Sequence, residues 1–427
     1  MEPIANTNGD VISPSKTKKT GAAKAFKFNP FLAEFHTDPY PIYDRLRFEE
    51  PVHRSFMGTW VLTRYADVKA VLRDPRFCVE KIPKNIKEKS YYLEQQQRDL
   101  NTLVQATSKW LLFLDPPDHT RLRGLVSKAF SSTVVERLRP QTQEIADELI
   151  SKVRDTGFMD IISDFACPLP VNVIATMLGV PTEDRTSLNQ WSDDLFNVLD
   201  PLRSLEDYEQ MNKVAMEFTD YFRNLIAERK KRPQEDLLSA LIAAKDQGKK
   251  LSEDEILSVC MLLFAAGEET TVNLIGNGML ALLRHPDQMQ KLKREPALIQ
   301  STVEELLRYD SPVQLIVRVA IENVDIGGKT IRAGERVCLS LGAANRDPAQ
   351  FSDPDRLDLI RRENSHLTFA DGIHYCLGAA LARAEGQIAI NTLVQQLPDL
   401  KLSHNPLEWR KKITLRGLKA LFVTFTP

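Results

Sequence analysis

Most of the chain places apolar residues at a helical period. The segments 133–153 and 211–233 each carry an apolar stripe with charged residues on the opposite face, which is typical of helices that pack on a core. A short strand and then a helix are predicted within 58–74, strands joined by glycine turns within 317–341, and a hairpin within 412–427. Strands and helices do not alternate regularly, so the pattern disfavours a doubly wound fold and favours a mainly α protein with a small β part.

The longest apolar pattern runs from Ser252 to Pro286. Ser252 and Glu255 form a capping-box signature, and Pro286 marks a helix end. One unbroken helix of about 50 Å is therefore predicted. A helix that is so long and so apolar must cross the core of the molecule.

The centre of this predicted helix, residues 265–271, combines small residues with acids and hydroxyls. Burying a carboxylate without a partner is costly, so two interpretations stay open. In one, small residues admit a flat group while Glu269 and Thr270 handle protons. In the other, Glu268 and Glu269 face solvent and Thr270 bonds back to a carbonyl. The helix face that resembles the roof of a pocket is shared by Leu262, Ala265, Ala266, Glu269 and Thr270.

Composition narrows the class of protein. The 56 basic and 58 acidic residues give a net charge of −2, which argues against nucleic-acid binding through bulk charge. The five cysteines are odd in number and far apart, which indicates a reducing, cytoplasmic setting without a disulfide framework. No apolar run approaches the roughly 18 residues of a membrane span, so none is expected.

Cys376 is the candidate reactive thiol. It lies in HLTFADGIHYCLGAALARAE, residues 366–385, directly before a strong helical pattern. A helix N-terminus is expected to lower the pKa of a thiol and favour thiolate. Such a thiolate suits a zinc site, a cysteine hydrolase or haem iron. His366 and His374 lie nearby, although a fourth zinc ligand is not evident, and spacing alone leaves the hydrolase open.

Two further patterns are common when taken alone. Glu305 and Arg308 are three residues apart on a predicted helix and can pair, with Arg356 as a second partner from a Pro- and Asp-rich loop. His119 and Arg123 are four apart at a predicted helix start, where they can clamp an anion. The simpler interpretations are an exposed ion pair and a solvated basic face.

Taken together and in order, these motifs resemble the cytochrome P-450 family over about residues 30 to 427. Residues 266–271 resemble its oxygen-binding helix motif, and Glu305 with Arg308 its Glu-x-x-Arg pair. Ala370 departs from the pattern, which usually has glycine there; alanine resists positive φ, so a slight adjustment of the loop is expected. The haem-ligand loop of the family is matched by Phe369, Gly372, His374, Cys376 and Gly378.

The resemblance implies one large, mainly α domain over 29–427, built around the long central helix, after a disordered tail at 1–28. It implies non-covalent haem b with Cys376 as the axial iron ligand, proton delivery by Glu269 and Thr270, and a brace formed by Glu305, Arg308 and Arg356. Four of the implied haem contacts lie at propionate positions, namely His119, Arg123, Arg318 and His374. The others are Ala266, Phe369 and Gly378. The expected pocket walls are Leu262, Ala265, Ala266, Val313, Gln314, Ile316, Thr414 and Leu415.

The expected activity is O₂-dependent hydroxylation or epoxidation of a medium-sized hydrophobic molecule in secondary metabolism. The expected type is the soluble bacterial one, a monomer supplied by ferredoxin and an NAD(P)H-dependent ferredoxin reductase. The segments 80–109 and 183–233 resemble mobile lids. The intact Glu269–Thr270 pair speaks against a peroxide-using relative, whereas a non-catalytic haem-thiolate sensor stays open. The predicted contacts for the electron donor are Arg121, Lys128, Arg361 or Arg362.

Overall fold

The computed structural model describes residues 28–79, 88, 90–92, 98–185, 191, 194–195, 197–199, 204–246 and 249–427. Apart from Phe28, the predicted tail lies outside these residues, as do parts of both predicted lid segments. Phe28 is buried and packs edge-to-face on Phe35, with ring centroids 5.6 Å apart. This residue therefore belongs to the packed protein and not to a tail.

Helices dominate the described chain, as the periodicity predicts. They are α1 (Ala33–Thr37), α2 (Tyr40–Glu49), α3 (Tyr65–Arg73), α5 (Asn101–Ser108), α6 (Asp118–Ala129), α7 (Ser132–Val153), α8 (Pro168–Met177), α10 (Leu205–Lys231), α11 (Leu237–Ala243), α12 (Glu253–Gly267), α13 (Glu269–Arg284), α14 (Pro286–Arg294), α15 (Ile299–Tyr309), α16 (Leu341–Ala344) and α17 (Ala379–Gln396).

The strands form small sheets. The largest has the order β1-β2-β10-β7-β3, in which β10 runs parallel to β2 and the other pairs are antiparallel. β8 and β9 form the hairpin predicted at the glycine pair. The strand bounds are β1 Val52–Arg54, β2 Trp60–Leu62, β3 Phe77–Cys78, β4 Phe158–Asp160, β5 Lys245–Asp246, β6 Lys249–Lys250, β7 Leu315–Ala320, β8 Val324–Ile326, β9 Lys329–Ile331, β10 Arg336–Ser340, β11 Lys401–Leu402 and β12 Phe422–Thr424.

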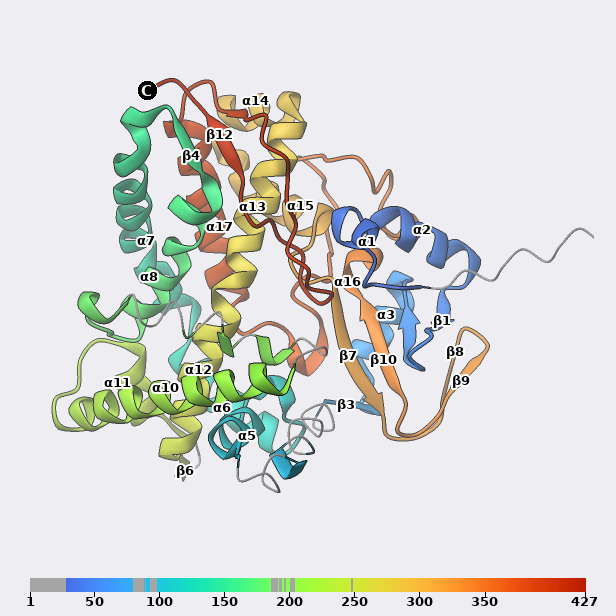
Figure 1. The fold of residues 1–427 in the computed structure, drawn as a ribbon, viewed down its shortest axis with the longest axis vertical. Coiled ribbons are helices and arrows are strands. Elements are labelled where there is room, and N and C mark those ends of the chain that lie inside the picture. Colours follow the sequence, from blue (N-terminus) through green and yellow to red (C-terminus); the bar gives the residue numbers. More distant parts are fainter. Residues whose placement is uncertain are drawn as a thin grey trace, which may run out of the picture.

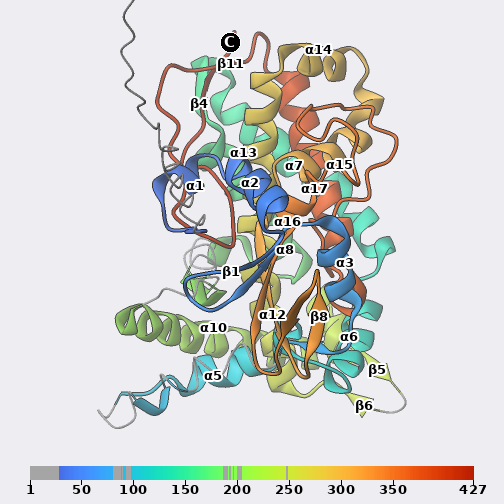
Figure 2. The ribbon, with the colours of Figure 1, turned by 90° about the vertical axis from the view of Figure 1, so that its right-hand side faces the viewer.

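The helical part and the sheet part lie side by side. In Figure 1 the sheet with α1, α2 and α3 occupies the right-hand side, and the helices around α12, α13 and α17 occupy the left. Figure 2 views the molecule from the sheet side, with α12 and α13 passing behind it. One apolar core fills the helical part, and a second joins the sheet to α3. The loop before α17 thus lies where the two parts meet.

The central helix is interrupted at Glu268, between α12 and α13. The prediction of one unbroken helix is wrong at this point. The hydroxyls of Thr270 and Thr271 donate to the carbonyls four residues earlier, at 2.9 and 3.0 Å, and such back-bonding bends helices. The predicted capping box is confirmed, because Ser252 and Glu255 exchange side-chain-to-backbone hydrogen bonds at 3.2 and 2.8 Å.

The span Glu253–Arg284 is long and apolar enough to cross a membrane by length and composition alone. However, 72% of its most apolar window is buried inside the molecule. Burial on all sides explains an all-round apolar helix equally well. This finding fits the core helix predicted from the sequence.

The predicted C-terminal hairpin is wrong. Trp409 and Leu418 form an isolated antiparallel bridge, as do Val313 and Leu415. β12 pairs with β11 on one side and with β4 on the other. The terminal strand therefore finds distant partners, which local alternation of apolar residues does not reveal.

Candidate functional site

The loop that carries Cys376 is closed by its own backbone. The Cys376 N–H donates to the Phe369 carbonyl at 2.9 Å, and the Cys376 carbonyl accepts from Ala379 at the start of α17. Ala370 and Gly372 have φ angles of 58° and 70°. Ala370 thus keeps the left-handed conformation that favours glycine, and the loop is not adjusted around it as expected.

The electrostatics of the sulfur differ from the prediction. Desolvation raises the pKa of the Cys376 thiol, and the Gly378 backbone together with the positive charges of Arg123 and Arg383 opposes this rise. A lowered pKa was expected from the helix N-terminus alone, but the desolvation of the packed sulfur outweighs it. Two guanidinium groups around the sulfur nevertheless favour a thiolate once a metal cation binds it.

The zinc alternative finds no support. In the part of the chain that the structure describes, no group of three or more His, Cys, Asp or Glu side chains has the arrangement of a metal site. His366 is turned toward Glu304, with Nε2 and Oε2 3.2 Å apart. A structural zinc site needs four protein ligands, whereas one axial thiolate suffices for haem.

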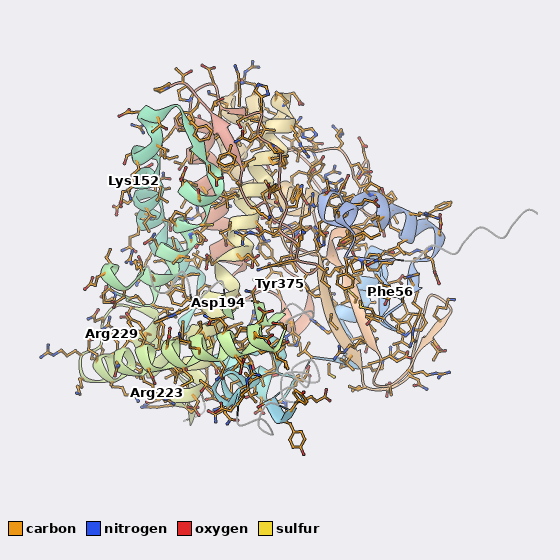
Figure 3. All side chains as sticks on the ribbon, in the orientation of Figure 1. Phe56, Lys152, Asp194, Arg223, Arg229 and Tyr375 are labelled. Atoms are coloured by element: carbon orange, nitrogen blue, oxygen red, sulfur yellow. The ribbon has the colours of Figure 1, made fainter. Side chains whose placement is uncertain are left out.

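Arg383 completes this loop and was missed by sequence reasoning. Its guanidinium lies 4.5 Å from the centroid of the Phe369 ring and donates to the Tyr375 hydroxyl at 3.1 Å and to Glu304 at 2.6 Å. Burial alone would raise the pKa of Glu304, but hydrogen bonds from His366 and Arg383 lower it to about 2. Figure 3 labels Tyr375, near the junction of the two parts of the molecule. The available signal was spacing, since Arg383 lies two helical turns after the cysteine.

The four predicted propionate residues come together beside the cysteine loop. The rings of His119 and His374 have centroids 4.4 Å apart. Arg123, on the same helix as His119, donates to the Tyr375 carbonyl at 2.8 Å. Arg318 projects from β7 and is buried. These residues belong to a helix, a strand and a loop that are far apart in the sequence.

One acid, Asp115, lies near this cluster, with its Oδ1 3.9 Å from Nε2 of His374. Both ring nitrogens of His119 and Nε2 of His374 are buried without a hydrogen-bond partner in the described structure. Burial lowers the pKa of His119 to about 4 and that of Arg318 to about 10, and Asp115 opposes both shifts. Buried cationic groups normally face compensating anions. A ligand with two carboxylates, such as haem, fits this cluster.

Two features beside the cluster are compatible with a bound flat group. A Cβ at Gly378 would meet nothing within 4 Å. On the central helix, Leu262, Ala266 and Thr270 keep some accessible surface, whereas Ala265 and Glu269 are buried. Ala265, expected in the pocket wall, is fully buried and presents no surface there. These observations leave the haem contacts Ala266, Phe369 and Gly378 as compatible predictions.

Gly267 serves packing between helices. A Cβ at this position would lie 2.6 Å from Cδ1 of Ile174 in α8. Glycine at the end of α12 therefore lets α8 approach closely. This small residue does not admit a flat group, in contrast to the first interpretation of the motif.

Both acids of the helix break are buried, so the solvent-facing interpretation is wrong for Glu268 and Glu269. Thr270 does bond back to a carbonyl, that of Ala266, as this interpretation expected. Glu269 Oε2 lies 2.7 Å from Nζ of Lys412, and Oε1 lies 3.8 Å from Arg410. Sequence reasoning missed both cations, because they follow Glu269 by more than a hundred residues.

Among the remaining predicted pocket residues, the segments around 313 and 415 meet, whereas the side chain of Gln314 is turned into the protein. Val313 and Leu415 form a β-bridge, and the Thr414 carbonyl accepts from the Gln314 N–H at 2.8 Å, so these segments do meet. The Gln314 side chain instead donates to the Ser311 carbonyl at 2.8 Å. A Cβ at residue 342 would lie 2.2 Å from Gln314 Oε1. Gln314 thus packs inside the protein, as a backbone-bonding amide does. Ile316, on β7, is half-buried.

The predicted brace is present with one partner exchanged. Arg308 donates to Glu305 at 2.8 and 2.9 Å, and both side chains are fully buried. Arg361 donates to the same carboxylate at 3.1 Å with only 7% of its side chain exposed. Arg356 contributes its carbonyl to Arg308, whereas its side chain is 60% exposed and pairs with Asp353. The arginine that braces Glu305 by charge is therefore Arg361.

This exchange removes a predicted contact for the electron donor. Arg361 is buried in the brace, and Arg121 pairs with Glu255 of α12. Lys128 and Arg362 are exposed. Arg121 and Arg361, both expected to meet a partner, are thus held by acids of the protein itself.

Comparison with known proteins gives a consistent result. A model of the family described as Cytochrome P450 matches residues 56–408. The biotin biosynthesis cytochrome P450 of Bacillus subtilis (strain 168) is 44% identical over 396 residues, 92% of this chain and 98% of that protein. The polyketide biosynthesis cytochrome P450 PksS of the same organism is 40% identical over 409 residues, 93% of this chain and 98% of that protein.

Solved structures agree. A crystal structure of P450BioI in complex with hexadec-9Z-enoic acid ligated acyl carrier protein matches with a TM-score of 0.84 and 43% identity. The match covers 92% of this chain and 99% of that chain. The family uses haem b, O₂ and a redox partner that supplies electrons. The chain belongs to the cytochrome P450 family, and it is an oxidoreductase of the monooxygenase type.

Proposed function

We propose that this monooxygenase hydroxylates or epoxidises a medium-sized hydrophobic molecule with an aliphatic chain, in secondary metabolism. Apolar and small side chains on the accessible face of α12 and along 313–316 suit an apolar ligand. The relatives named above act, by their names, in biotin and polyketide biosynthesis, and one is bound to a fatty acyl chain on a carrier protein. Ferredoxin and an NAD(P)H-dependent reductase are the proposed electron source, and the cytoplasm the proposed location.

The observation that carries the proposed site is the group of basic side chains beside Cys376, in which His119 and Arg318 are buried and both ring nitrogens of His119 lack a hydrogen-bond partner among the described residues. Arg318, Arg123, His119 and His374 would hold the two propionates, and the Cys376 thiolate would ligate the iron. When bound, haem supplies O₂ activation. The Glu305 brace holds the segment before the cysteine loop, so that the sulfur keeps its position when the protein fluctuates.

Thr270 and Glu269 are the proposed proton-delivery residues. The Thr270 hydroxyl donates to the Ala266 carbonyl at 2.9 Å, beside the helix break. It lies on the accessible face of the central helix, and Glu269 is its immediate neighbour. A hydroxyl held in this way orients water and passes protons between the acid and the pocket.

Two measurements test the haem assignment. Purified protein, reduced and treated with CO, is expected to show the strongly red-shifted Soret band of thiolate ligation, and Cys376→Ala is expected to lose it. Cys338→Ala is the matched control, because Cys338 is a buried free cysteine on β10. A colourless protein that binds zinc would refute the assignment.

The oxygen chemistry is tested by steady turnover. Product formation is expected with NAD(P)H, ferredoxin and reductase, and a faster reaction with peroxide alone would favour a peroxide-using enzyme. A protein that binds ligands without turning over either system would be a sensor. A spectral-shift screen of fatty acyl and polyketide compounds identifies the substrate class.

Thr270→Ala is expected to uncouple the enzyme, so that NAD(P)H is consumed at a near-normal rate while hydrogen peroxide replaces product. The reason is that the variant removes the hydroxyl but leaves the electron supply intact. Thr270→Ser keeps the hydroxyl and is expected to retain coupling. Equal coupling in all three proteins would remove Thr270 from the mechanism.

A further inference from the structure

Glu269 forms a buried ion pair with a loop that is distant in sequence. It opens α13 and is only 4% exposed, and its Oε2 lies 2.7 Å from Lys412 Nζ. Its Oε1, 3.8 Å from Arg410, is buried without a hydrogen-bond partner among the described residues. The side chains of Lys412 and Arg410 are 16% and 25% exposed. The acid thus lies in the interior, and its cations extend from it toward the surface.

The loop that carries Lys412 is firmly attached to the protein. Arg416 donates to Asp310 at 2.8 Å and to the His36 carbonyl at 2.7 Å, and its guanidinium lies 3.5 Å from the centroid of a Trp409 ring. Asn277 of α13 donates to the Arg416 carbonyl at 3.0 Å. The distance between this loop and α13 is therefore set by several hydrogen bonds, and Lys412 reaches Glu269 from a defined position.

The polar face of α13 continues under this loop. Glu269, Asn273 and Asn277 follow one another at the spacing of one helical turn. Asn273 is buried, and neither polar atom of its side chain has a partner among the described residues. A Cβ at Gly417 would lie 1.7 Å from Asn273 Oδ1. Backbone and amide thus pack in direct contact, and the loop covers a polar stripe instead of an apolar one.

Water has a place beside this ion pair. A small cavity of about 10 Å³ is lined by Arg410, Lys412, Ile413, His36 and other residues. This volume is about what one water molecule requires, and the cavity has several polar groups in its wall. A water there would connect the ammonium group to the molecular surface.

We propose that Lys412 is a positioning residue for proton supply. It holds Glu269 at the break of the central helix, next to Thr270, and connects the carboxyl group to water at the loop 409–417. In each cycle the Glu269 carboxylate takes one proton from water on the Lys412 side and passes it toward Thr270, so the carboxylate is regenerated. This inference rests on the proposed role of Glu269 and Thr270.

The test compares three variants in the haem-loaded enzyme with its electron supply. Lys412→Met removes the charge but keeps a side chain of similar length. It is expected to lower the ratio of product formed to NAD(P)H consumed severalfold, and hydrogen peroxide is expected to account for the difference. The solvent isotope effect on product formation is expected to increase. Lys412→Arg keeps a cation and is expected to restore most of the coupling. Lys411→Met is the matched control, because Lys411 is the exposed neighbour, and it is expected to behave like wild type.

Infrared spectroscopy supplies a readout that does not depend on turnover. A buried carboxylate that loses its cation takes up a proton. Lys412→Met is therefore expected to show an additional carboxylic-acid C=O band, beyond any band of wild type, and the double variant Lys412→Met/Glu269→Gln is expected to lack this addition. Loss of stability without this band would indicate a purely structural ion pair and would overturn the proposal.

The outcomes separate this inference from the function on which it rests. Normal coupling in Glu269→Gln would refute proton delivery by Glu269 itself. Uncoupling in Glu269→Gln together with normal coupling in Lys412→Met would refute only the role of Lys412. If Lys412→Met does not fold, Lys412→Gln, which keeps a hydrogen-bond donor but no charge, replaces it in every comparison.

Discussion

Ala370 shows how a single residue can oppose its own backbone conformation. Its φ of 58° lies in the left-handed region, which costs an L-residue with a Cβ roughly 1–2 kcal/mol. The conformation persists because the Ala370 N–H donates to the Leu367 carbonyl at 2.8 Å and the next loop bond joins Cys376 to Phe369. The cysteine loop therefore imposes this backbone on a residue that does not favour it.

Ala370→Gly is expected to stabilise the protein by roughly 0.5–1 kcal/mol, since relief of the strain exceeds the entropy cost of glycine. Ala70→Gly is the control, because Ala70 is exposed within α3, and it is expected to destabilise by about 1 kcal/mol. Urea unfolding of both variants measures the two shifts. If both variants lose stability relative to wild type, the loop tolerates alanine at position 370 without strain.

Glu385 is a buried acid that the proposed mechanism does not use. It lies on α17, and neither carboxylate oxygen has a well-formed hydrogen bond to a described residue. Burial raises the pKa of Glu385 from its ordinary value of 4.5 to about 8, which the nearby Thr271 hydroxyl opposes only in part. The folded protein therefore favours the neutral acid.

A pH dependence of stability follows from this shift. Between about pH 4.5 and pH 8 the folded state keeps a proton at Glu385 that the unfolded chain has lost, so stability falls as pH rises, by at most about 1.4 kcal/mol per unit. Glu385→Gln cannot lose this proton. Its free energy of unfolding is measured by urea denaturation at several pH values. This free energy is expected to rise relative to that of wild type as the pH approaches 8. Parallel profiles would contradict the raised pKa.

At the scale of elements, the contacts that shape the site lie at junctions between helices and loops. The central helix is broken at Glu268, where two threonine hydroxyls bond to carbonyls of the preceding turn. Farther along, α15 presents Glu305 and Arg308 to the loop 352–364, and Arg361 and Asn364 of this loop donate to Glu305. The brace thus attaches an irregular loop, and the cysteine loop that follows it, to a regular helix.

The two arginines of the loop 352–364 provide a matched comparison. Arg361→Met leaves part of a buried carboxylate without its cation, and it is expected to destabilise by about 3 kcal/mol. Arg356→Met removes an exposed ion pair and is expected to cost less than about 1 kcal/mol. Denaturant unfolding of the two variants checks this order, and a reversed order would refute the assignment of the brace to Arg361.

At the scale of the whole molecule, the proposed haem site draws its residues from both the helical part and the sheet part. His119 and Arg123 come from α6, Arg318 from the sheet and His374 from the cysteine loop. Burial lowers the pKa of His119, Arg123 and Arg318. These groups would stabilise a ligand anion, and their charged forms are costly to bury without one.

Arg318→Met is accordingly expected to have opposite effects in two states. Without haem, the variant should be at least as stable as wild type, because a buried cation with a pKa lowered to about 10 is removed. With haem, its rate of haem loss should rise roughly tenfold or more. Haem transfer to apomyoglobin and urea unfolding measure the two effects.

Arg336→Met is the control for this comparison, since Arg336 is an exposed residue on the neighbouring strand β10. It is expected to change neither quantity. Faster haem loss in both variants would indicate general disruption of the sheet instead of a lost propionate contact. A less stable haem-free Arg318→Met would refute the claim that this cation is costly to bury.

Local pattern alone determined the mainly helical composition, the capped start of the central helix, the glycine hairpin of β8 and β9, and the position of Cys376 before α17. These features depend on residues within a few turns of one another, and the order of motifs along the chain identified the family. Tertiary structure alone decided that Lys412 and Arg410 face Glu269, that Arg361 and not Arg356 pairs with Glu305, and that the terminal strand joins β4 and β11. Charged side chains are long and chemically alike, so which of them meet depends on how distant segments pack and on which carboxylates that packing buries.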